Sequence, residues 1–416
     1  MTATKPRTRL LVLTSTFPRW KDDLEPPFVF ELSRRLTAAF DITVLAPRSP
    51  GCLQHETMDG LDVVRFPYCV RRWENLATHG GGILSRLRAN PLNYLLVPPF
   101  LIGQVWALVR LLRGDNWDLI HAHWLIPQGV VALIARWLAR RQVALICTSH
   151  GGDLFALRGR LFRTLKRAVL NASARITVVS ATMRDEVVAL GVKADRVAII
   201  PMGVDLQARF TPEPAIARQQ NELLFVGRLV EKKGVALLLQ ALPQVLQAFP
   251  DTRLTIAGGG PLDAELRLLS ESLGVSNHVD FRGMVSQEEL PALYRRATLF
   301  VAPFLVASSG DQEGFGLVLV EAMGCGCPVI CGNVPAVRDI VHNDETGVLA
   351  NPQDPQDLAD AIIGLLADPI RRDRYAANAR RHCQKRFDWG TIAARYRTLL
   401  LDALPKDARL ASPERS

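Results

Sequence analysis

Short runs of aliphatic residues alternate with longer amphipathic segments along the whole chain. Strand-like runs in the first half are Leu10–Leu13, Ile42–Leu45, Val63–Phe66, Leu119–His121, Val143–Cys147, Ile176–Val179 and Val197–Ile200. These runs are nearly continuous in apolar residues, and helix-length segments separate them. The pattern is typical of a parallel sheet that is covered by helices on both faces.

The pattern is interrupted after Ile200, in a stretch that contains Pro201, Pro212 and Pro214, and we expect an interdomain linker there. It then resumes, with strands predicted at Leu223–Val226, Leu254–Ala257, Val279–Phe281, Leu299–Ala302 and Val329–Cys331. Helices are predicted around Val235–Ala248 and Ala264–Leu273. The sequence therefore predicts an α/β protein made of two doubly wound, Rossmann-like units that face one another across a cleft.

The length of the chain agrees with two domains. Its 416 residues are many for one core and sufficient for two domains of about 200 residues each. We predict an N-terminal Rossmann-like domain over residues 1–205 and a C-terminal one over residues 206–388. A helix over residues 389–405 is expected to pack back on the N-terminal domain, and the polar tail 406–416 is expected to be disordered.

The net charge of +9 is concentrated in the N-terminal half. Seven basic and no acidic residues lie between Leu154 and Arg184, and six basic residues lie between Arg71 and Arg113 against the single acid Glu74. No helix-turn-helix, RNA-recognition or zinc-finger pattern accompanies this charge, so we expect no nucleic-acid partner. A solvated basic face and a surface for an anionic membrane or acceptor are both open.

The apolar segment 92–112 bears on the same question. It is long enough to span a bilayer and carries one charge, Arg110. Because Pro98 and Pro99 interrupt it, a buried or membrane-facing helix pair fits this segment better than a true span. We therefore expect a cytoplasmic protein in peripheral contact with the inner face of the cell membrane.

The cysteines predict neither a disulfide framework nor a metal centre. Seven is an odd number, and the C-x-C-x3-C spacing of Cys325, Cys327 and Cys331 lacks a nearby His or a second Cys pair. We assign no metal ligands and interpret these cysteines as small apolar residues that line a packed turn.

Polar and glycine residues follow the predicted strands. In open parallel sheets, ligands bind at the carboxyl ends of the strands. The segments expected at those ends include His121 and His123, His150–Asp153, Gly227-Arg228 and Gly258–Pro261. The binding residues of the cleft are therefore expected to come from these segments.

The segment from Ser308 to Ile330 carries the most chemical information. Gly314 and Gly316 flank Phe315 at the expected start of a helix, where backbone amides and the helix dipole favour a phosphate. Carboxylates stand at Glu313, before the helix, and at Glu321, within it. Carboxylates do not bind phosphate but accept hydrogen bonds from sugar hydroxyls, so the combination indicates a nucleotide-sugar.

A pair of basic residues follows another predicted strand. Arg228 lies at the strand end, and Lys233 comes five residues later at a helix start. A planar guanidinium and a compact ammonium can converge on one diphosphate. Their role would be to neutralise the charge that develops on a departing diphosphate.

These segments resemble the retaining glycosyltransferase family 4, which has the GT-B fold, over nearly the whole chain. Glu313-Gly-Phe-Gly-Leu-Val-Leu-Val-Glu321 matches the Glu-x7-Glu signature of that family, and Gly227-Arg228 with Lys233-Gly234 matches its phosphate-binding pair. Ala257–Pro261 matches its glycine turn, Pro201–Asp205 its linker motif, and Phe387-Asp-Trp389 the point where the last helix crosses back. The loop Thr16–Pro27 replaces the glycine pair of many relatives and resembles bacterial polysaccharide- and glycolipid-building members.

The resemblance implies a role for each matched residue. It places Arg228 and Lys233 on the donor diphosphate, Glu313 on the transferred sugar, and His150 beside that sugar. The implied donor-binding residues are Gly227, Gly258, Gly259, Arg282, Gly283, Met284, Gly314, Phe315, Gly316, Leu317 and Glu321. Apart from the resemblance, acceptor contacts are expected from Arg19, His123 and Asp153, with loop scaffolding or structural packing open as the alternative for each.

The expected function is metal-independent transfer of a hexose, with retention, from a UDP- or GDP-sugar to a lipid-linked or saccharide acceptor in cell-envelope synthesis. No cofactor is expected, because the nucleotide-sugar is a co-substrate. Two alternatives remain open on these residues. A nucleotide-sugar epimerase of the same fold would turn over donor alone, and a non-catalytic sugar-nucleotide binder would transfer nothing.

Overall fold

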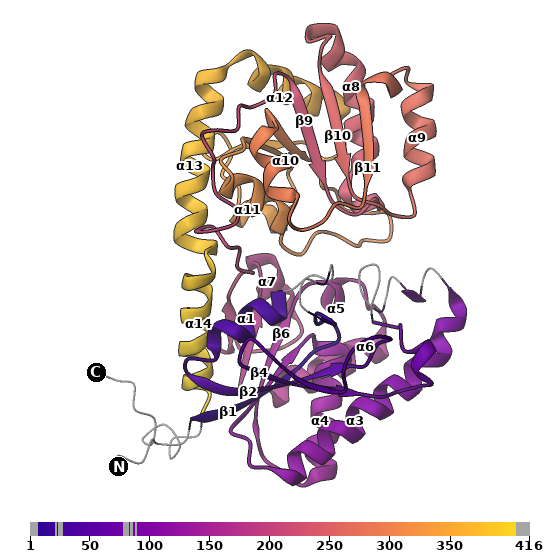
Figure 1. The fold of residues 1–416 in the computed structure, drawn as a ribbon, viewed down its shortest axis with the longest axis vertical. Helices are drawn as coiled ribbons and strands as arrows, with labels where there is room; N and C mark the ends of the chain where they lie inside the picture. The colour runs from indigo at the N-terminus through magenta and orange to yellow at the C-terminus, as the bar shows by residue number, and fades with distance from the viewer. Residues whose placement is uncertain are drawn as a thin grey trace. The chain divides into compact units, whose positions relative to one another are not determined.

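The computed structural model describes residues 7–20, 23, 28–77, 83, 86–87 and 90–404. Contacts divide the chain into two compact units (Figure 1). Unit 1 contains the residues up to Val179, Met183–Ile200 and those from Ala393 onward, and unit 2 contains Ser180–Thr182 and Pro201–Ile392. The sequence placed the corresponding boundaries at 205 and 388, and its predicted tail 406–416 lies outside the described residues.

Unit 1 is built on a sheet of eight strands in the order β3-β4-β2-β1-β5-β6-β7-β8. The strands are β1 (Thr8–Leu13), β2 (Phe40–Pro47), β3 (His55–Met58), β4 (Leu61–Phe66), β5 (Leu119–His123), β6 (Ala144–Ser149), β7 (Arg175–Val178) and β8 (Val197–Ile199). Only the β3–β4 pairing is antiparallel among the pairings of this sheet in the described chain. The carboxyl ends of β5 and β6 therefore lie at one edge, which brings His123 and His150 together.

Helices complete unit 1. They are α1 (Phe28–Leu36), α3 (Val97–Gly114), α4 (Val130–Ala139), α5 (Gly152–Phe155), α6 (Arg160–Ala172), α7 (Ala181–Ala189, which starts in unit 2) and α14 (Trp389–Asp402, which ends in unit 1). Helices α3 and α4 pack side by side (Figure 1). A 3-10 helix, η2 (Pro91–Leu96), leads directly into α3.

The apolar segment 92–112 thus forms η2 and α3. Pro98 and Pro99 stand in the first turn of α3, where a missing amide hydrogen breaks no helical bond, so they begin the helix rather than interrupt it. Pro91–Gly114 is long and apolar enough to cross a bilayer. One side of α3 is buried in unit 1 through Phe100, Leu108 and Leu112, which is the arrangement of a surface helix.

Unit 2 is built on a parallel sheet of six strands in the order β11-β10-β9-β12-β13-β14. The strands are β9 (Glu222–Val226), β10 (Arg253–Ala257), β11 (Val279–Gly283), β12 (Leu299–Ala302), β13 (Val329–Gly332) and β14 (Val348–Ala350). The helices are α8 (Val235–Ala248), α9 (Asp263–Ser272), α10 (Leu290–Arg296), α11 (Leu317–Gly324), α12 (Pro355–Ala367) and α13 (Pro369–Phe387). Leu223 and Phe225 of β9 and Leu238 of α8 lie fully buried in its core.

The proline-containing stretch after Ile200 belongs to unit 2 and packs against the rest of it. Leu206 and Phe210 are buried, and the guanidinium of Arg295 donates to the carbonyl oxygens of Arg209 and Thr211. The same stretch meets the start of α14, where Val204 pairs with Asp388. A Cβ atom at Gly203 would lie 2.3 Å from the Trp389 indole ring, so only glycine fits beneath it. The predicted linker is therefore a structured part of unit 2.

The alternating α/β architecture and the twelve strands named from the sequence are confirmed, whereas β3 and β14 were missed. Strand β3 has the sequence His-Glu-Thr-Met, and its polar residues give no apolar run. It forms because the two-residue turn at Asp59-Gly60 returns the chain antiparallel to β4. Strand β14 is short and lies between Gly347 and Asn351-Pro352, residue types that are typical of loops.

Candidate functional site

Two loops of unit 2, one after β9 and one before α11, are joined by an ion pair. Lys233 Nζ lies 2.8 Å from Glu313 Oε2, and both side chains are mostly buried. Lys233 also lies over the ring of Phe304, 4.4 Å from its centroid. The structure thus brings together the lysine and the carboxylate that the sequence identified from two separate motifs.

The neighbouring side chains fasten the same two loops to each other. Lys232 Nζ lies 3.2 Å from Asp311 Oδ1, and the carboxylate of Glu231 accepts from the amide and the hydroxyl of Ser308 at 2.7 and 3.0 Å. These contacts leave little freedom for the segment that leads into α11. They place Glu313 beside Lys233.

The charge of Lys233 controls the ionisation of Glu313. Burial raises the pKa of this carboxyl, but the charges of Lys233 and Lys232 and its hydrogen bonds outweigh burial and lower the pKa to about 2. Glu313 is therefore a carboxylate at neutral pH and accepts hydrogen bonds. That is the state needed to bind sugar hydroxyls.

Helix α11 starts a few residues after Glu313. Gly316 has a φ of +99° and precedes the first helical residue, Leu317, so the helix begins where the sequence predicted. The side chain of Phe315 is buried and packs edge-on against Phe387, with ring centroids 5.5 Å apart. Phe315 can therefore offer a ligand its backbone only. The amides of Gly316 and Leu317 lie at the positive end of the helix dipole.

Glu321 lies one turn further along α11 and is buried. It accepts a hydrogen bond of 2.9 Å from the hydroxyl of Tyr294 on α10. Burial raises the pKa of Glu321 to about 7, although the Tyr294 hydrogen bond and the charges of Arg209 and Lys233 favour its ionised form. A buried carboxyl with one donor can still accept from a further hydroxyl group.

The glycine turn after β10 packs against the loop that carries Arg228. A Cβ atom at Gly258 would lie 1.8 Å from the carbonyl oxygen of Gly227, and the amide of Leu229 donates to Gly259. The backbone approach that glycine permits is thus used to hold these two loops together. Arg228 itself is exposed at the end of β9.

The residues after β11 complete the predicted donor set. The amide of Gly258 donates to the carbonyl oxygen of Gly283 at 2.7 Å, which places this backbone beside the glycine turn. Arg282 forms an exposed ion pair with Asp280 at 3.0 Å, and the side chain of Met284 is exposed. Their expected contact with a nucleobase stays a prediction.

In unit 1, three histidines cluster at the carboxyl ends of β5 and β6, with His121 and His123 buried and His150 partly buried. His123 Nδ1 lies 3.0 Å from His150 Nε2, and their rings stack 5.3 Å apart. His121 Nε2 lies 2.7 Å from the hydroxyl of Thr148. Burial lowers the pKa of His121 and of His150 to about 3 and that of His123 well below its usual value. All three rings are therefore neutral at pH 7.

Two of the residues that are predicted to contact the acceptor, Asp153 and Arg19, have hydrogen-bond partners within unit 1. The carboxylate of Asp153 accepts from the amide of Leu125 at 2.6 Å and from the hydroxyl of Ser149 at 2.8 Å. Arg19 is buried and forms an ion pair of 2.6 Å with Asp23. Both groups brace loops of unit 1, and their contact with an acceptor stays a prediction. Sequence reasoning did not find these partners, nor Tyr294 and Phe304 in unit 2.

The described residues contain no group of three or more His, Cys, Asp or Glu side chains arranged to hold a metal ion. Cys325, Cys327 and Cys331 are buried free thiols. Burial raises the pKa of Cys327 to about 11 and that of Cys325 to about 12. They pack as the small apolar residues that the sequence indicated.

Comparison with known proteins follows the same division of the chain. The family model described as Glycosyltransferase Family 4 matches residues 27–208, and the model described as Glycosyl transferases group 1 matches residues 207–382.

The chain is 32% identical to a phosphatidyl-myo-inositol mannosyltransferase of Mycobacterium tuberculosis, over 85% of this chain and 86% of the relative. It is 28% identical to a GDP-mannose-dependent alpha-(1-6)-phosphatidylinositol monomannoside mannosyltransferase of Mycolicibacterium smegmatis, over 94% and 98% of the two chains.

Two solved structures share the fold. The chain is similar to the sucrose-phosphate synthase of Thermosynechococcus elongatus, with a TM-score of 0.76, 23% identity and coverage of 94% of this chain and 98% of that one. It is also similar to Anabaena HepE in complex with UDP-glucose, with a TM-score of 0.72, 21% identity and coverage of 96% and 100%. The shared fold is the two-domain GT-B arrangement of Rossmann-like units.

The buried histidines predict a pH dependence of stability. Their folded pKa values lie below the unfolded value near 6.5, so the unfolded chain binds more protons and stability falls as pH drops below that value. Each such histidine costs about 2 kcal/mol of stability between pH 6.5 and pH 5. The variant His123→Phe keeps a ring of similar size and removes one titrating group.

Urea unfolding of both proteins at pH 7 and pH 5 measures the difference. The wild type is expected to lose about 2 kcal/mol more than His123→Phe over this interval. Equal losses would show that His123 is not held neutral by burial.

Proposed function

Because the chain belongs to glycosyltransferase family 4, we propose that it transfers mannose from GDP-mannose to a phosphatidylinositol-type glycolipid. It is a hexosyltransferase of the GT-B fold that uses a nucleotide-sugar. The choice of GDP-mannose and of an inositol lipid is supported by relatives whose names specify this donor and this acceptor class and which the chain matches over most of their length.

The observation that carries the proposal is the pair Lys233–Glu313 at the start of α11. A cation beside amides of a helix start suits a diphosphate, and a carboxylate held ionised by that cation suits sugar hydroxyls. One ion pair thus offers complementary groups to the two halves of a nucleotide-sugar. We assign Lys233 to the diphosphate, together with Arg228, and Glu313 to the transferred sugar.

The configuration at the anomeric carbon is retained if the acceptor attacks from the side on which the diphosphate leaves. The bond from the anomeric carbon to the diphosphate oxygen breaks, and the bond to the acceptor oxygen forms on the same face. The acceptor proton passes to an oxygen of the leaving diphosphate, so no side chain has to act as a base. Lys233 and Arg228 would stabilise the charge that develops on the diphosphate.

Glu321 has a separate role in this scheme. Its carboxyl is buried one turn into α11 and keeps lone pairs free beyond the bond from Tyr294. We assign it to the ribose hydroxyls of the donor. The reaction is proposed to need no metal ion, since the cations of Lys233 and Arg228 neutralise the diphosphate.

Transfer of labelled mannose tests the assignment. With GDP-mannose and vesicles that contain phosphatidylinositol or its mannosides, the wild type is expected to form labelled glycolipid, also in the presence of EDTA. Lys233→Ala and Glu313→Ala should each lower kcat/KM by about a hundredfold or more. Lys385→Ala, which removes an exposed lysine of α13, serves as control.

Three outcomes would contradict the proposal. Unchanged transfer by Lys233→Ala would remove that residue from the site, and a preference for a UDP-sugar would overturn the donor. Turnover of donor without acceptor would favour the epimerase alternative.

We further propose that η2 and α3 rest on the membrane that holds the acceptor. Leu95 of η2 and Ile102 and Trp106 of α3 expose 74%, 68% and 64% of their surface. Pro98, Ile102, Trp106 and Arg110 follow one another at four-residue spacing, which forms one exposed stripe along the helix. An apolar stripe with a basic end is the pattern of a helix that lies in the membrane interface.

Vesicle flotation of Ile102→Asp/Trp106→Asp tests this contact. The double variant should float with phosphatidylcholine vesicles at least tenfold less than the wild type, because two inserted side chains are lost and two charges are added. Leu268→Asp, on α9 of unit 2 and 65% exposed, controls for the loss of an exposed apolar side chain. Equal flotation of the wild type and the double variant would remove the stripe from the membrane contact.

A further inference from the structure

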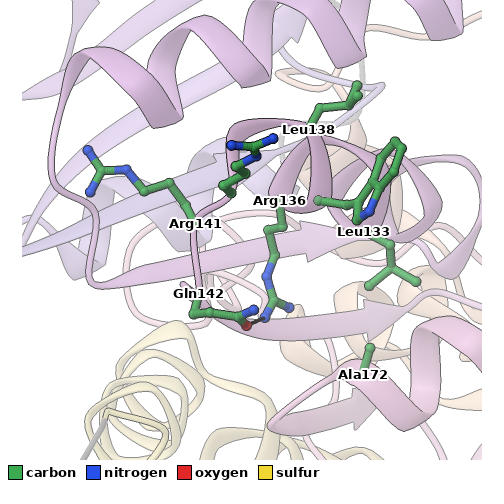
Figure 2. Close-up of a pocket in the computed structure, with 8 residues that line it drawn as sticks. Leu133, Arg136, Leu138, Arg141, Gln142 and Ala172 are labelled. Carbon is green, nitrogen blue, oxygen red and sulfur yellow. Dashed lines mark hydrogen bonds between the residues drawn. The ribbon is translucent and has the colours of Figure 1, made fainter.

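A hollow of about 640 Å³ opens at the carboxyl end of α4 in unit 1, and none of its lining residues is assigned to sugar transfer (Figure 2). Its wall combines three arginines with apolar side chains, and its lining residues are Leu133, Arg136, Trp137, Leu138, Arg140, Arg141, Gln142 and Ala172. None of these described lining residues carries a carboxylate. This composition requires an explanation, because neither the fold nor the proposed reaction uses these cations.

The hollow lies at the opposite edge of the sheet from the histidine cluster. Helix α4 connects β5 to β6, which run parallel, so it runs antiparallel to both strands. Its last residue, Ala139, is therefore at the edge where β6 begins, whereas His123 and His150 are at the edge where β5 and β6 end. The hollow is thus separate from the acceptor edge.

The three arginines lack an anionic partner within the described part of the chain. Arg136 Nη2 donates to the amide oxygen of Gln142 over 3.4 Å, as Figure 2 shows, and its Nε is buried without a hydrogen-bond partner. Burial lowers the pKa of Arg136, the direction expected for a desolvated cation without nearby counter-charge. Arg140 and Arg141 are exposed and form no ion pair there.

Neutralising the helix dipole does not account for these cations. Basic side chains are common at helix carboxyl ends because they bind the last carbonyl groups. Here the carbonyl oxygens of Trp137 and Arg136 accept from the backbone amides of Arg140 and Arg141, and that of Leu138 accepts from Arg113 on α3. The guanidinium groups of the hollow therefore remain available to another anion.

The surroundings identify the kind of anion. Trp137 is 76% exposed and Leu138 is 40% exposed on the wall of the hollow, and α4 packs against α3, which carries the stripe of Ile102 and Trp106. From residue 75 to residue 184 the sequence contains only three acidic residues, Asp115, Asp118 and Asp153. Arginines beside exposed tryptophan and leucine match a phosphate that is attached to acyl chains.

We propose that this hollow binds the phosphate of an anionic phospholipid headgroup, through Arg136, Arg140 and Arg141. The site rests on the membrane contact proposed above and deepens it. The apolar stripe supplies attachment to any bilayer, and the hollow supplies the preference for anionic lipid. It would hold the side of unit 1 that carries α3 and α4 against the leaflet.

Flotation with two vesicle compositions tests the site. Wild-type protein should bind vesicles of 30 mol% phosphatidylglycerol in phosphatidylcholine more tightly than vesicles of phosphatidylcholine alone. Arg140→Ala/Arg141→Ala should weaken binding to the anionic vesicles by about thirtyfold, the loss expected from two basic residues at a membrane surface. Its binding to pure phosphatidylcholine should be unchanged.

The matched control is Arg381→Ala/Lys385→Ala, which removes two exposed charges from α13 of unit 2. It changes the net charge equally and should keep the anionic preference. An equal loss in both double variants would overturn the site, since it would reflect net charge alone. Retention of the preference by Arg140→Ala/Arg141→Ala would overturn it as well, and so would equal binding of the wild type to both vesicle types.

Inorganic phosphate distinguishes a lipid from a soluble anion. If submillimolar phosphate raised the Tm of the wild type but not of Arg140→Ala/Arg141→Ala, the hollow would be a site for free phosphate and the lipid assignment would be wrong. The rate of mannose transfer to a water-soluble acceptor should be the same in the wild type and in Arg140→Ala/Arg141→Ala. This measurement separates the two proposals. If the proposed transferase function is wrong, the wild type itself will show no transfer, whatever the outcome for the headgroup site.

Discussion

The ion pair between Lys233 and Glu313 is the interaction on which the proposed donor site of unit 2 depends. It joins the loop after β9 to the segment that starts α11, and Lys232 and Glu231 fasten the same two segments beside it. The pair also determines the ionisation of Glu313, because the lysine charges lower the pKa of this mostly buried carboxyl and keep it ionised. A bound diphosphate would share Lys233 with this carboxylate. The structure thus holds a cation and an ionised hydrogen-bond acceptor side by side, the two kinds of group that the proposed donor needs.

Much of this arrangement follows from the sequence, because strand ends determine where side chains meet. Buried parallel strands have a strong apolar signal, and the residues after them lie at one edge of the sheet, so the motifs that contain Lys233 and Glu313 could be expected near one ligand. Their direct ion pair was not predicted. The contact of Tyr294 with Glu321 could not be predicted in this way. It depends on how α10 packs against α11, and neither helix contains a local signal for its partner.

Unit 1 shows that residue type alone does not reveal the internal partners of a side chain. Arg19 and Asp153 stay predicted acceptor contacts, and the structure adds internal partners that the sequence did not indicate, namely Asp23 for Arg19, and Ser149 and the amide of Leu125 for Asp153. The basic character of this unit, in contrast, was visible in the sequence. The fold adds what the sequence could not show, namely that α3 and α4 lie side by side and combine an apolar stripe with a hollow of arginines.

The central claim is that Lys233 binds the outer phosphate of the donor diphosphate. Isothermal titration of GDP and GMP to the wild type and to Lys233→Met measures this most directly, because the two nucleotides differ by that phosphate. The wild type should bind GDP at least tenfold more tightly than GMP, and Lys233→Met should lose this preference while its affinity for GMP is kept. An undiminished preference for GDP in Lys233→Met would contradict the account.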